Sequence, residues 1–464
     1  MTSSSPSFST IISIFEQQSY SYESLGLTDH APLLHALEGL NQRSGIQFIQ
    51  LGRKELRATQ YVGVIQVDKC LIQILPKIDF DPKANINAPQ GSSSYEYSVN
   101  SAARNFIFLL NYALGLKFNN QTLTTLSTSR GNWTELLISL FARELQMQLE
   151  RGFHQDYIRK EDLLPYIRGR WNIARQFICQ PNIIQGLDVS YDDYLPDILL
   201  NRVFRLVIDR LQRVSHQPSN RQILADLELW LQPVTLVREL SNLDLDQVKF
   251  DRLNDRFYSA FQLARLFLEN QTVQLLAGGQ RALAFVFDMD KLFEKFVAKL
   301  LQEHANQILP GDWLGQPLEL QGGSKINYLV QPPYPNEQPM FQLKPDVLLG
   351  FPGMPILIID TKNKALPLRR YYRSIAESDA YQMIAYATHF HCPNILLLYP
   401  RSQGAEDTLP TILSVEQTHV RLFIATVNLH QPLDRLDPLI RDFRDLFSYL
   451  YLHNVSHSEV TWSA

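Results

Sequence analysis

Two acidic residues and a lysine flank the most apolar hairpin that the sequence predicts. Residues 343–364 read LKPDVLLGFPGMPILIIDTKNK, in which two apolar runs are joined by a Phe-Pro-Gly turn. This pattern predicts two buried antiparallel strands. Asp346 precedes the first strand, and Asp360 and Lys362 end the second. Carboxylates and an amine at the end of a buried sheet are groups that can hold a metal ion and activate water.

The register of this hairpin decides whether the two acids meet. A turn centred on Gly353 pairs Val347 with Ile359, and it places Asp346 opposite Asp360 with roughly 4.5–5.5 Å between their Cβ atoms. Like charges opposed across strands repel, and a divalent cation between them would reverse the sign of that interaction. Oxygen ligands of this kind suit Mg²⁺. A slip of one residue would move one acid to the other face.

A helix predicted before the hairpin brings a further carboxylate. Residues 287–301, FDMDKLFEKFVAKLL, have apolar side chains at helical spacing, and Asp288 or Asp290 would cap the N-terminus. Glu294 lies at the margin of the apolar stripe, at about 100° per residue. Glu294 either points across the edge of the core toward a cation or is a surface glutamate. The pattern alone favours the surface glutamate. The stripe comprises Leu292, Phe293, Phe296, Val297, Leu300 and Leu301.

Polar and basic side chains follow the hairpin. The helix predicted at 374–390 places Asp379, Gln382 and Tyr386 on one face, at i, i+3 and i+7. Basic residues between the second strand and this helix would form a local positive surface that binds DNA phosphates. They are Lys364, Arg369, Arg370 and Arg373.

The whole chain sets limits on these chemistries. Its 464 residues exceed one hydrophobic core, so we expect two or three domains. The 43 Lys and Arg against 47 Asp and Glu give a net charge of −4, so any DNA contact must use a local patch. Three cysteines lie far apart without a CxxC pair, and neither a signal peptide nor an apolar run of about 18 residues occurs. We expect a cytoplasmic protein with no membrane partner.

The first part of the chain has strand character. Residues 61–67 and 70–75 are rich in Val and Ile and predict a hairpin, with a possible bulge at Gly63. The stretch 79–97 contains Pro, Asn, Gly and a Ser triplet, so we expect a loop there and a domain boundary.

Helical periodicity dominates the middle of the chain. One segment, 163–175 (LLPYIRGRWNIAR), is instead expected to be extended and basic. Its Arg168, Arg170 and Arg175 could contact phosphates or an acidic partner, although solvated loop arginines are the simpler interpretation. The helical segments are 102–116, 133–149, 196–214, 221–230 and 250–268.

The last part of the chain predicts a mixed sheet with helices packed on it. Its order is helix, three strands, helix, two strands. We therefore predict an α+β multidomain protein. Its domains are a β-rich region at 1–95, a mainly helical region at 96–277 and an α/β core at 278–464. The expected strands of the core are 325–330, 341–349, 355–362, 394–399 and 421–427.

Together these residues resemble the PD-(D/E)XK nuclease core, a restriction-endonuclease-like fold. The D-x-K acid here is Asp rather than Glu, which that pattern permits. A Gln and a Tyr also have the Q-x-x-x-Y spacing of the RecB-like branch. The matching residues are Pro345-Asp346, Asp360-Thr361-Lys362, Glu294 on the preceding helix, Gln382 and Tyr386.

Four stretches across the chain are similar to the McrC family, the nuclease subunits of McrBC modification-dependent restriction systems in phage defence. The resemblance implies a hexameric AAA+ GTPase partner, McrB, that recognises and translocates double-stranded DNA with methylated cytosine. It also implies that the N-terminal region engages the ring and stimulates GTP hydrolysis. The chain has no G-x-x-x-x-G-K-[ST] loop, so GTP would be bound by the partner. The stretches are YVGVIQVDKCLIQILPKI, IRGR, ALAFVFDMDKLFEKFVAKLL and DAYQMIAYA.

The resemblance also implies roles in a Mg²⁺-dependent endonuclease. Asp346, Asp360 and the carbonyl oxygen of Thr361 would hold the metal, and Glu294 would complete its shell. Lys362 would position or deprotonate the attacking water. The remaining site residues, which would orient substrate or supporting groups, are Gln382, Tyr386, Lys364 and Arg370.

Two other functions stay open. The chain could be a non-catalytic assembly factor that activates an AAA+ partner, although the intact acids and lysine argue against this. It could also be a RecB-like nuclease with a different motor and no dependence on methylation.

Overall fold

The computed structural model describes most of the chain, and secondary structure, contacts and burial are given for those residues alone. They are 10–27, 31–67, 70–76, 93–116, 133–179, 186–275, 281–320, 327–330, 339–351, 353–364, 366, 373, 375–401, 410–430 and 435–455.

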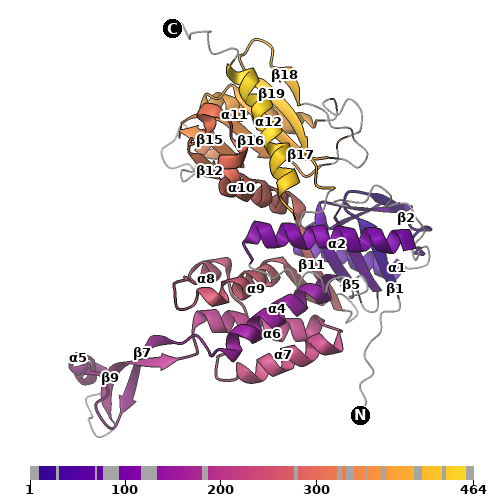
Figure 1. Cartoon of the computed structure of the whole chain (residues 1–464). Coiled ribbons are helices and arrows are strands. Elements are labelled where there is room, and N and C mark those ends of the chain that lie inside the picture. The colour runs from indigo at the N-terminus through magenta and orange to yellow at the C-terminus, as the bar shows by residue number, and fades with distance from the viewer. Residues whose placement is uncertain are drawn as a thin grey trace. The chain divides into compact units, whose positions relative to one another are not determined.

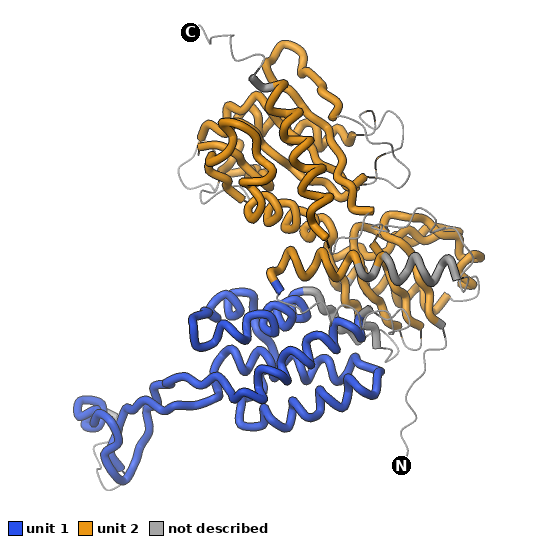
Figure 2. The backbone as a smooth tube through the Cα atoms, viewed as in Figure 1, with its two compact units in different colours: residues 1–7, 116–272 blue, residues 8–115, 273–464 orange. Residues whose placement is uncertain are grey.

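The chain forms two compact units with mixed α and β structure and several separate sheets (Figure 2). Unit 1 comprises residues 1–7 and 116–272, and unit 2 comprises residues 8–115 and 273–464. Within the described residues, no helix is long and apolar enough to cross a membrane.

Unit 2 begins with a five-stranded sheet of order β1-β6-β5-β11-β10. The predicted hairpin is confirmed, because β5 and β6 are antiparallel with Val67 opposite Cys70. β11 was not expected, since the sequence pattern gave only the helix that follows it. The bounds are β1 Thr10–Phe15, β5 Tyr61–Val67, β6 Cys70–Leu75, β10 Gln271–Leu275 and β11 Arg281–Asp288.

Gly63 lies in a regular part of this sheet, so the expected bulge is wrong. It pairs with Ile74 on one side and with Val286 on the other, without a shift in register. A Cβ atom at this position would lie 2.2 Å from the carbonyl oxygen of Phe285. The glycine is therefore explained by the close approach of β11.

Two helices accompany this sheet. α1 (Ala31–Ser44) packs its Leu37 and Leu40 into a core with residues of β1, β5, β6 and β11. α2 (Ser93–Leu114) contacts β6 and a later helix, α10. The predicted loop at 79–97 is wrong at its end, because α2 begins at Ser93, and residues 79–92 lie outside the described part. Unit 2 also contains a small sheet of order β2-β4-β3, with bounds β2 Ser19–Ser21, β3 Ile49–Leu51 and β4 Glu55–Ala58.

Unit 1 is a helical bundle from which a β-stranded arm extends (Figure 1). The helices predicted at 133–149, 196–214 and 221–230 are found with boundaries that differ by a few residues, whereas the helix predicted at 250–268 begins only at Tyr258. α8 and the arm strands were not expected. The helices are α4 Trp133–Glu150, α6 Leu199–Val214, α7 Pro218–Trp230, α8 Asn242–Asp246, η3 Asp255–Phe257 and α9 Tyr258–Asn270.

The arm comprises residues 156–195. Its strands β7 (Asp156–Leu164) and β9 (Leu187–Leu195) pair along their whole length, and β8 (Arg170–Trp171) adds to β9. The expected extended segment ends early, because a short helix, α5, spans Ile173–Cys179.

The C-terminal part of unit 2 contains a six-stranded mixed sheet of order β12-β15-β16-β17-β19-β18. β16, β17 and β19 are parallel, and the other pairs are antiparallel. The strand expected at 341–349 is interrupted at 344–346, and its first half pairs with β13 in a separate sheet. The bounds are β12 Leu318–Leu320, β13 Asn327–Val330, β14 Met340–Leu343, β15 Val347–Phe351, β16 Met354–Thr361, β17 Asn394–Pro400, β18 Thr411–Ser414 and β19 Arg421–Val427.

Three long helices accompany this sheet. α11 (Glu377–Phe390) packs on the face that carries Ile358 and Leu397. α10 (Met289–Ile308) contacts β16, and α12 (Asp437–Val455) contacts β19 and α10. A short helix, η4, spans Gly311–Trp313. The expected apolar stripe of α10 is confirmed, since its six members are buried, and Asp288 is the capping residue.

Candidate active site at the end of the β15–β16 hairpin

The hairpin has the predicted register where it matters for the acids. Val347 pairs with Ile359, and the register shifts only nearer the turn, at Gly350. Gly350 has φ = +116°, a backbone conformation that favours glycine, so the irregularity lies where a side chain is absent. The shift leaves the open end of the hairpin unchanged, and Asp346 and Asp360 therefore lie next to the Val347–Ile359 pair.

Asp346 lies just before β15, is half-buried and is held by the opposite strand. Thr361 donates its backbone N–H, at 2.6 Å, and its hydroxyl, at 2.7 Å, to Oδ2 of Asp346. Burial raises the pKa of Asp346, and the two bonds from Thr361 and the charge of Lys362 partly oppose that rise. The carboxylate is thus fixed in place but remains costly to ionise.

Asp360 is the most buried acid of the site, with 2% of its surface exposed. Its Oδ2 lies 2.7 Å from Nζ of Lys362. Burial raises the pKa of Asp360, and the charge of Asp346 raises it further, while Lys362 opposes both. The ion pair therefore leaves the repulsion between the two carboxylates only partly compensated.

A hydrogen-bond chain connects Lys362 to α11. Nζ of Lys362 donates to Oε1 of Gln382 at 3.1 Å, and Nε2 of Gln382 donates to the hydroxyl of Tyr386 at 2.8 Å. Burial raises the pKa of Tyr386, and the charge of Asp360 adds to this. The structure thus brings together the lysine and the two helix residues that the sequence placed on one face.

A second ion pair lies beside this chain. Nζ of Lys364 lies 2.8 Å from Oδ2 of Asp379, which is buried in the first turn of α11. The hydroxyl of Tyr399 on β17 is buried and has no hydrogen-bond partner among the described residues. Burial raises the pKa of Tyr399, and the charges of Asp379 and Asp360 raise it further, so its hydroxyl lies within their electrostatic reach.

α10 brings two carboxylates toward the hairpin. Burial and the charge of Asp346 raise the pKa of Glu294 to about 6. Burial and the charge of Asp288 raise the pKa of Asp290 to about 6, while Lys364 and Lys362 oppose the rise. Glu294 is therefore not a plain surface glutamate. Asp290 was considered only as a cap, although its spacing of four residues from Glu294 puts both on one helix face.

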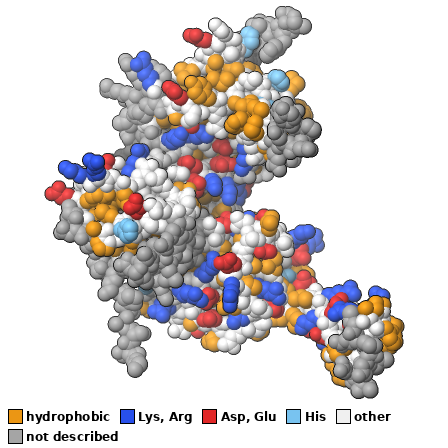
Figure 3. All heavy atoms as spheres, turned by 180° about the vertical axis from the view of Figure 1, so that it is seen from behind, with side chains coloured by type: hydrophobic (Ala, Val, Ile, Leu, Met, Phe, Trp, Pro, Cys, Tyr) orange, Lys and Arg blue, Asp and Glu red, His pale blue; other side chains and the backbone are white. Residues whose placement is uncertain are grey.

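The predicted basic surface is only partly described. Lys364 and Arg373 are both exposed, whereas Arg369 and Arg370 lie outside the described residues. On the visible face of Figure 3, Lys and Arg side chains alternate with Asp and Glu, with no large area of one sign. This mixture fits the net charge of −4.

The donor set at the hairpin end fits a hard divalent cation. Asp346 is half-buried and Asp360 is buried, the negative charge of the first disfavours ionisation of the second, and a cation would relieve that repulsion. Across the described part of the chain, no three His, Cys, Asp or Glu side chains gather closely enough to hold a metal by themselves. A third protein ligand would therefore have to be a backbone oxygen or a side chain that moves.

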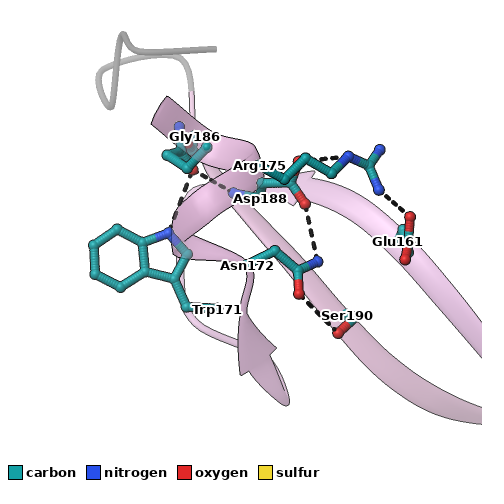
Figure 4. Close-up of polar contacts among 8 residues, drawn as sticks. Glu161, Trp171, Asn172, Arg175, Gly186, Asp188 and Ser190 are labelled. Atoms are coloured by element: carbon teal, nitrogen blue, oxygen red, sulfur yellow. Dashed lines mark hydrogen bonds and ion pairs between the residues drawn. The ribbon is translucent and has the colours of Figure 1, made fainter. Parts of the chain in front are cut away.

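The arm contains a different polar cluster, built from paired charges (Figure 4). Arg175 bonds Glu161 and lies 3.1 Å from Oδ2 of Asp188. Asn172 donates to Oδ1 of Asp188 at 3.1 Å, and the hydroxyl of Ser190 donates to Asn172 at 3.3 Å. These bonds connect β7, β9 and α5 and stiffen the arm.

Of the three arm arginines that the sequence suggested as contacts for phosphates or an acidic partner, two are engaged within the arm. Arg175 belongs to the cluster described above, and Arg168 lies 2.9 Å from Asp193 and 3.9 Å above the ring of Tyr191. Arg170 is exposed. The arm also exposes large apolar side chains: Tyr157, Leu163, Tyr166, Ile167, Ile173, Phe177, Ile178 and Tyr194.

Comparisons with known proteins show what this fold and this sequence are similar to. The fold is similar to a chain in a Thermococcus gammatolerans structure, described as a refined half-complex from a tetradecameric assembly of McrB AAA+ hexamers with bound McrC. The two chains are 22% identical with a TM-score of 0.63, over 95% of this chain and 100% of that one. A chain of the cryo-EM structure of the Thermococcus gammatolerans McrBC complex is 26% identical, over 64% of this chain and 88% of that one, with a TM-score of 0.47.

A search of curated proteins gives no match. The sequence matches the family model of the McrBC 5-methylcytosine restriction system component over residues 56–400. That match spans well over half of the 464 residues and includes the hairpin with its two acids. The chain therefore belongs to the McrBC 5-methylcytosine restriction system component family.

Proposed function

We propose that this chain is the McrC-type endonuclease subunit of a modification-dependent restriction system, with a PD-(D/E)XK core that hydrolyses DNA phosphodiesters. The observation that carries the proposal is the pair of neighbouring carboxylates, half-buried Asp346 and buried Asp360, of which the first raises the pKa of the second, with Lys362 at 2.7 Å from Asp360. Such a pair costs stability in the metal-free fold and gains a purpose when it binds a cation.

Asp346 and Asp360 would hold a Mg²⁺ ion, with the carbonyl oxygen of Thr361 as third protein ligand. Glu294 would complete the shell, directly or through water. When bound, the ion lowers the pKa of a water molecule and neutralises charge on the scissile phosphate. Thr361 has a second task, because its two bonds to Asp346 fix one carboxylate oxygen.

Lys362 would orient the attacking water and stabilise the charge that develops on the phosphate. Its amine is held between Asp360 and Gln382, so its position is restricted before substrate binds. Tyr386 supports Gln382. Lys364 and Arg370 would contact the DNA backbone, where cations add affinity without reading sequence.

The partner of this chain would be a McrB-type AAA+ GTPase hexamer that selects DNA with methylated cytosine. The fold similarity to a chain from an assembly of McrB hexamers with bound McrC supports this assignment. Since the sequence has no phosphate-binding loop of its own, GTP would be bound and hydrolysed by the partner.

Two regions are candidates for the contact with that partner. The first is residues 1–95, as the family resemblance implies. The second is the arm, because its tip exposes Phe177 and Ile178 at 57% and 81% of their surface. Exposed apolar side chains on a stiff projection are typical of a protein interface. Ile178→Asp is expected to reduce stimulation of the partner's GTP hydrolysis at least tenfold, with exposed Leu243→Asp on α8 as a matched control.

Cleavage of DNA by the purified protein tests the nuclease assignment. Wild type and Asp360→Ala are compared with Mg²⁺, with and without the AAA+ partner and GTP, on methylated and unmethylated DNA. We expect cleavage that requires the partner and methylation and that is lost in the variant, while GTPase stimulation persists.

Other outcomes would identify the alternatives. GTPase stimulation without cleavage of any substrate by wild type would indicate a non-catalytic assembly factor. Cleavage of unmethylated DNA without this partner would indicate a RecB-like nuclease with another motor. Normal cleavage by Asp360→Ala would show that the metal site is assigned to the wrong residues.

A further inference from the structure

The turn that follows the D-x-K segment is only three residues long. Lys362 still donates its backbone N–H to Leu398 of β17, at 2.9 Å, and Lys364 then donates its N–H back to the carbonyl of Lys362, also at 2.9 Å. This places Asn363 at the centre of a γ-type turn. The side chains of Lys362 and Lys364 reach Asp360 and Asp379, respectively.

Asn363 is held by the N-terminal sheet, far away in the sequence. Its side-chain amide donates to Oε2 of Glu16 at 3.2 Å, and its backbone carbonyl accepts a hydrogen bond from the side-chain amide of Gln17. Glu16 and Asn363 are both buried, with 1% and 6% of their surface exposed, respectively. A buried hydrogen bond to a carboxylate is stronger than a neutral one.

The corner of the sheet that carries Glu16 and Gln17 is itself fixed. Glu16 continues the pairing of β1 by donating its N–H to Leu75 at 2.8 Å. Gln17 has φ = +57°, a left-handed conformation unusual for a residue with a side chain, and its N–H is bonded to Thr59 at 3.1 Å. Strained backbone of this kind persists only where the surroundings determine it.

The same sheet also holds the start of α10. β11 pairs with β5 up to Asp288, and the N–H of Met289 donates to the carbonyl of Gln60 at 3.1 Å. α10 carries Asp290 and Glu294 toward the hairpin. One sheet therefore anchors two of the chain segments that supply the site with charged groups, the D-x-K segment and α10.

We propose that Glu16 and Gln17 are positioning residues for phosphodiester hydrolysis, which hold Asn363 and thereby set the position of the Lys362 ammonium group. This inference rests on the proposed nuclease function. Neither residue touches the substrate in this arrangement, so they act on the rate of the chemical step rather than on DNA binding. The N-terminal sheet is then part of the active-site structure.

Substitution of Glu16 in the full chain, assayed with its partner, tests this inference. Glu16→Ala leaves the buried amide of Asn363 without this acceptor, and we expect kcat for cleavage to fall roughly 10–100-fold with KM for DNA unchanged. Glu16→Gln keeps an acceptor oxygen and is expected to retain most of the wild-type kcat. Glu38→Ala, an exposed glutamate of α1, is the matched control.

Exchanging the carboxylate of Glu16 and the amide of Asn363 distinguishes a positioning role from a general loss of structure. Asn363→Asp sets two carboxylates against each other and should lower kcat at least as much as Glu16→Ala. Combining it with Glu16→Gln lets the new amide donate to the new carboxylate, and kcat should recover at least tenfold. Absence of recovery would overturn the proposal. A fall in GTPase stimulation that parallels the fall in kcat of Glu16→Ala would also overturn it, because Glu16 would then belong to the partner contact.

Hydrogen exchange of peptides that contain Asn363 gives a result independent of cleavage. We expect faster exchange in Glu16→Ala and no change in Glu38→Ala. Unchanged exchange in Glu16→Ala would overturn the positioning role even if cleavage is observed. Failure of wild type to cleave any DNA would refute the nuclease function alone, since the exchange result would still stand.

Discussion

The hairpin end and the arm both gather charged side chains, but they treat charge in opposite ways. In the arm, Asp193 lies 3.1 Å from Lys160 and 2.9 Å from Arg168, and the hydrogen bond from Lys160 is the main cause of its lowered pKa. At the hairpin end, burial raises the pKa of both Asp346 and Asp360, and the charge of Asp346 raises that of Asp360 further. The ion pairs of Asp193 favour its ionised form, whereas burial disfavours the ionised forms of Asp346 and Asp360.

The difference is the one expected between a structural network and a functional one. Balanced ion pairs at the surface of the arm help to hold β7, β9 and α5 together at little cost. Buried acids that repel each other reduce stability, so a fold keeps them only where another task depends on them. The direction of the pKa shift is thus a better guide to the active site than the number of charges, since both clusters contain several.

The largest effect expected from this contrast comes from removing one charge from each cluster. Asp346→Asn should lower cleavage by about a thousandfold or more, because it removes a proposed metal ligand. It should also raise the melting temperature of the metal-free protein at about pH 8, because the amide resembles the neutral acid that the fold favours. Cleavage assays and thermal unfolding measure the two effects.

Asp188→Asn in the arm is the matched substitution. It removes the charge that faces Arg175 and should lower stability rather than raise it. A decrease in melting temperature for both variants would contradict the contrast between the two clusters.

A smaller effect is expected where the site depends on a supporting contact. Gln382→Ala removes the acceptor of Lys362 and the donor to Tyr386 at once. We expect the single-turnover cleavage rate to fall about tenfold while DNA binding is unchanged, since outer contacts tune a site without forming it. A loss as large as that of Asp346→Asn would mean that Gln382 contacts the reacting groups directly.

The hairpin register could be predicted because strand alternation and the turn residues both constrain it. The pairing of Val347 with Ile359 and the bounds of the strand at 421–427 agree with the sequence-based expectation. The irregularity at Gly350 could not be anticipated, because a turn centred on Gly353 accounts for the same apolar pattern.

Other features depend on contacts between distant segments. β11 has a continuous apolar run that fits a strand or the start of a helix, and its pairing with β5 decides between them. Asp290 and Tyr399 belong to the site only because α10 and β17 carry them there. The link from Glu16 to Asn363 has no local sequence signal at all, since both are ordinary polar residues next to a strand end.

Lowering the pH should change the stability contributed by the acids near the hairpin end but not that contributed by Asp193 in the arm. The pKa values of Glu294 and Asp290 are raised to about 6, and that of Asp360 is also raised. A raised folded-state pKa means that the folded metal-free protein binds protons before the unfolded chain does. These three carboxyl groups should therefore contribute more to stability as the pH falls from about 8 to about 5.

Mg²⁺ should compete with these protons. The increase in melting temperature caused by Mg²⁺ should be several degrees at about pH 8 and should shrink toward zero near pH 5. Asp193 has a lowered pKa and stays ionised over this range, so the arm should contribute nothing to the change. A Mg²⁺ effect that is independent of pH would argue against binding at the raised-pKa carboxylates.

The smallest effect concerns the ion pair between Arg175 and Asp188. The arginine side chain is about half exposed, so solvent screens the attraction. A double-mutant cycle with Arg175→Ala and Asp188→Asn should give a coupling free energy of about 0.2–1 kcal/mol. Local hydrogen exchange of the arm strands measures this, because the arm can open without global unfolding. A coupling above about 2 kcal/mol would show that the arm network is as strongly interdependent as a buried site, and the contrast drawn from the two clusters would then have to rest on the sign of their pKa shifts alone.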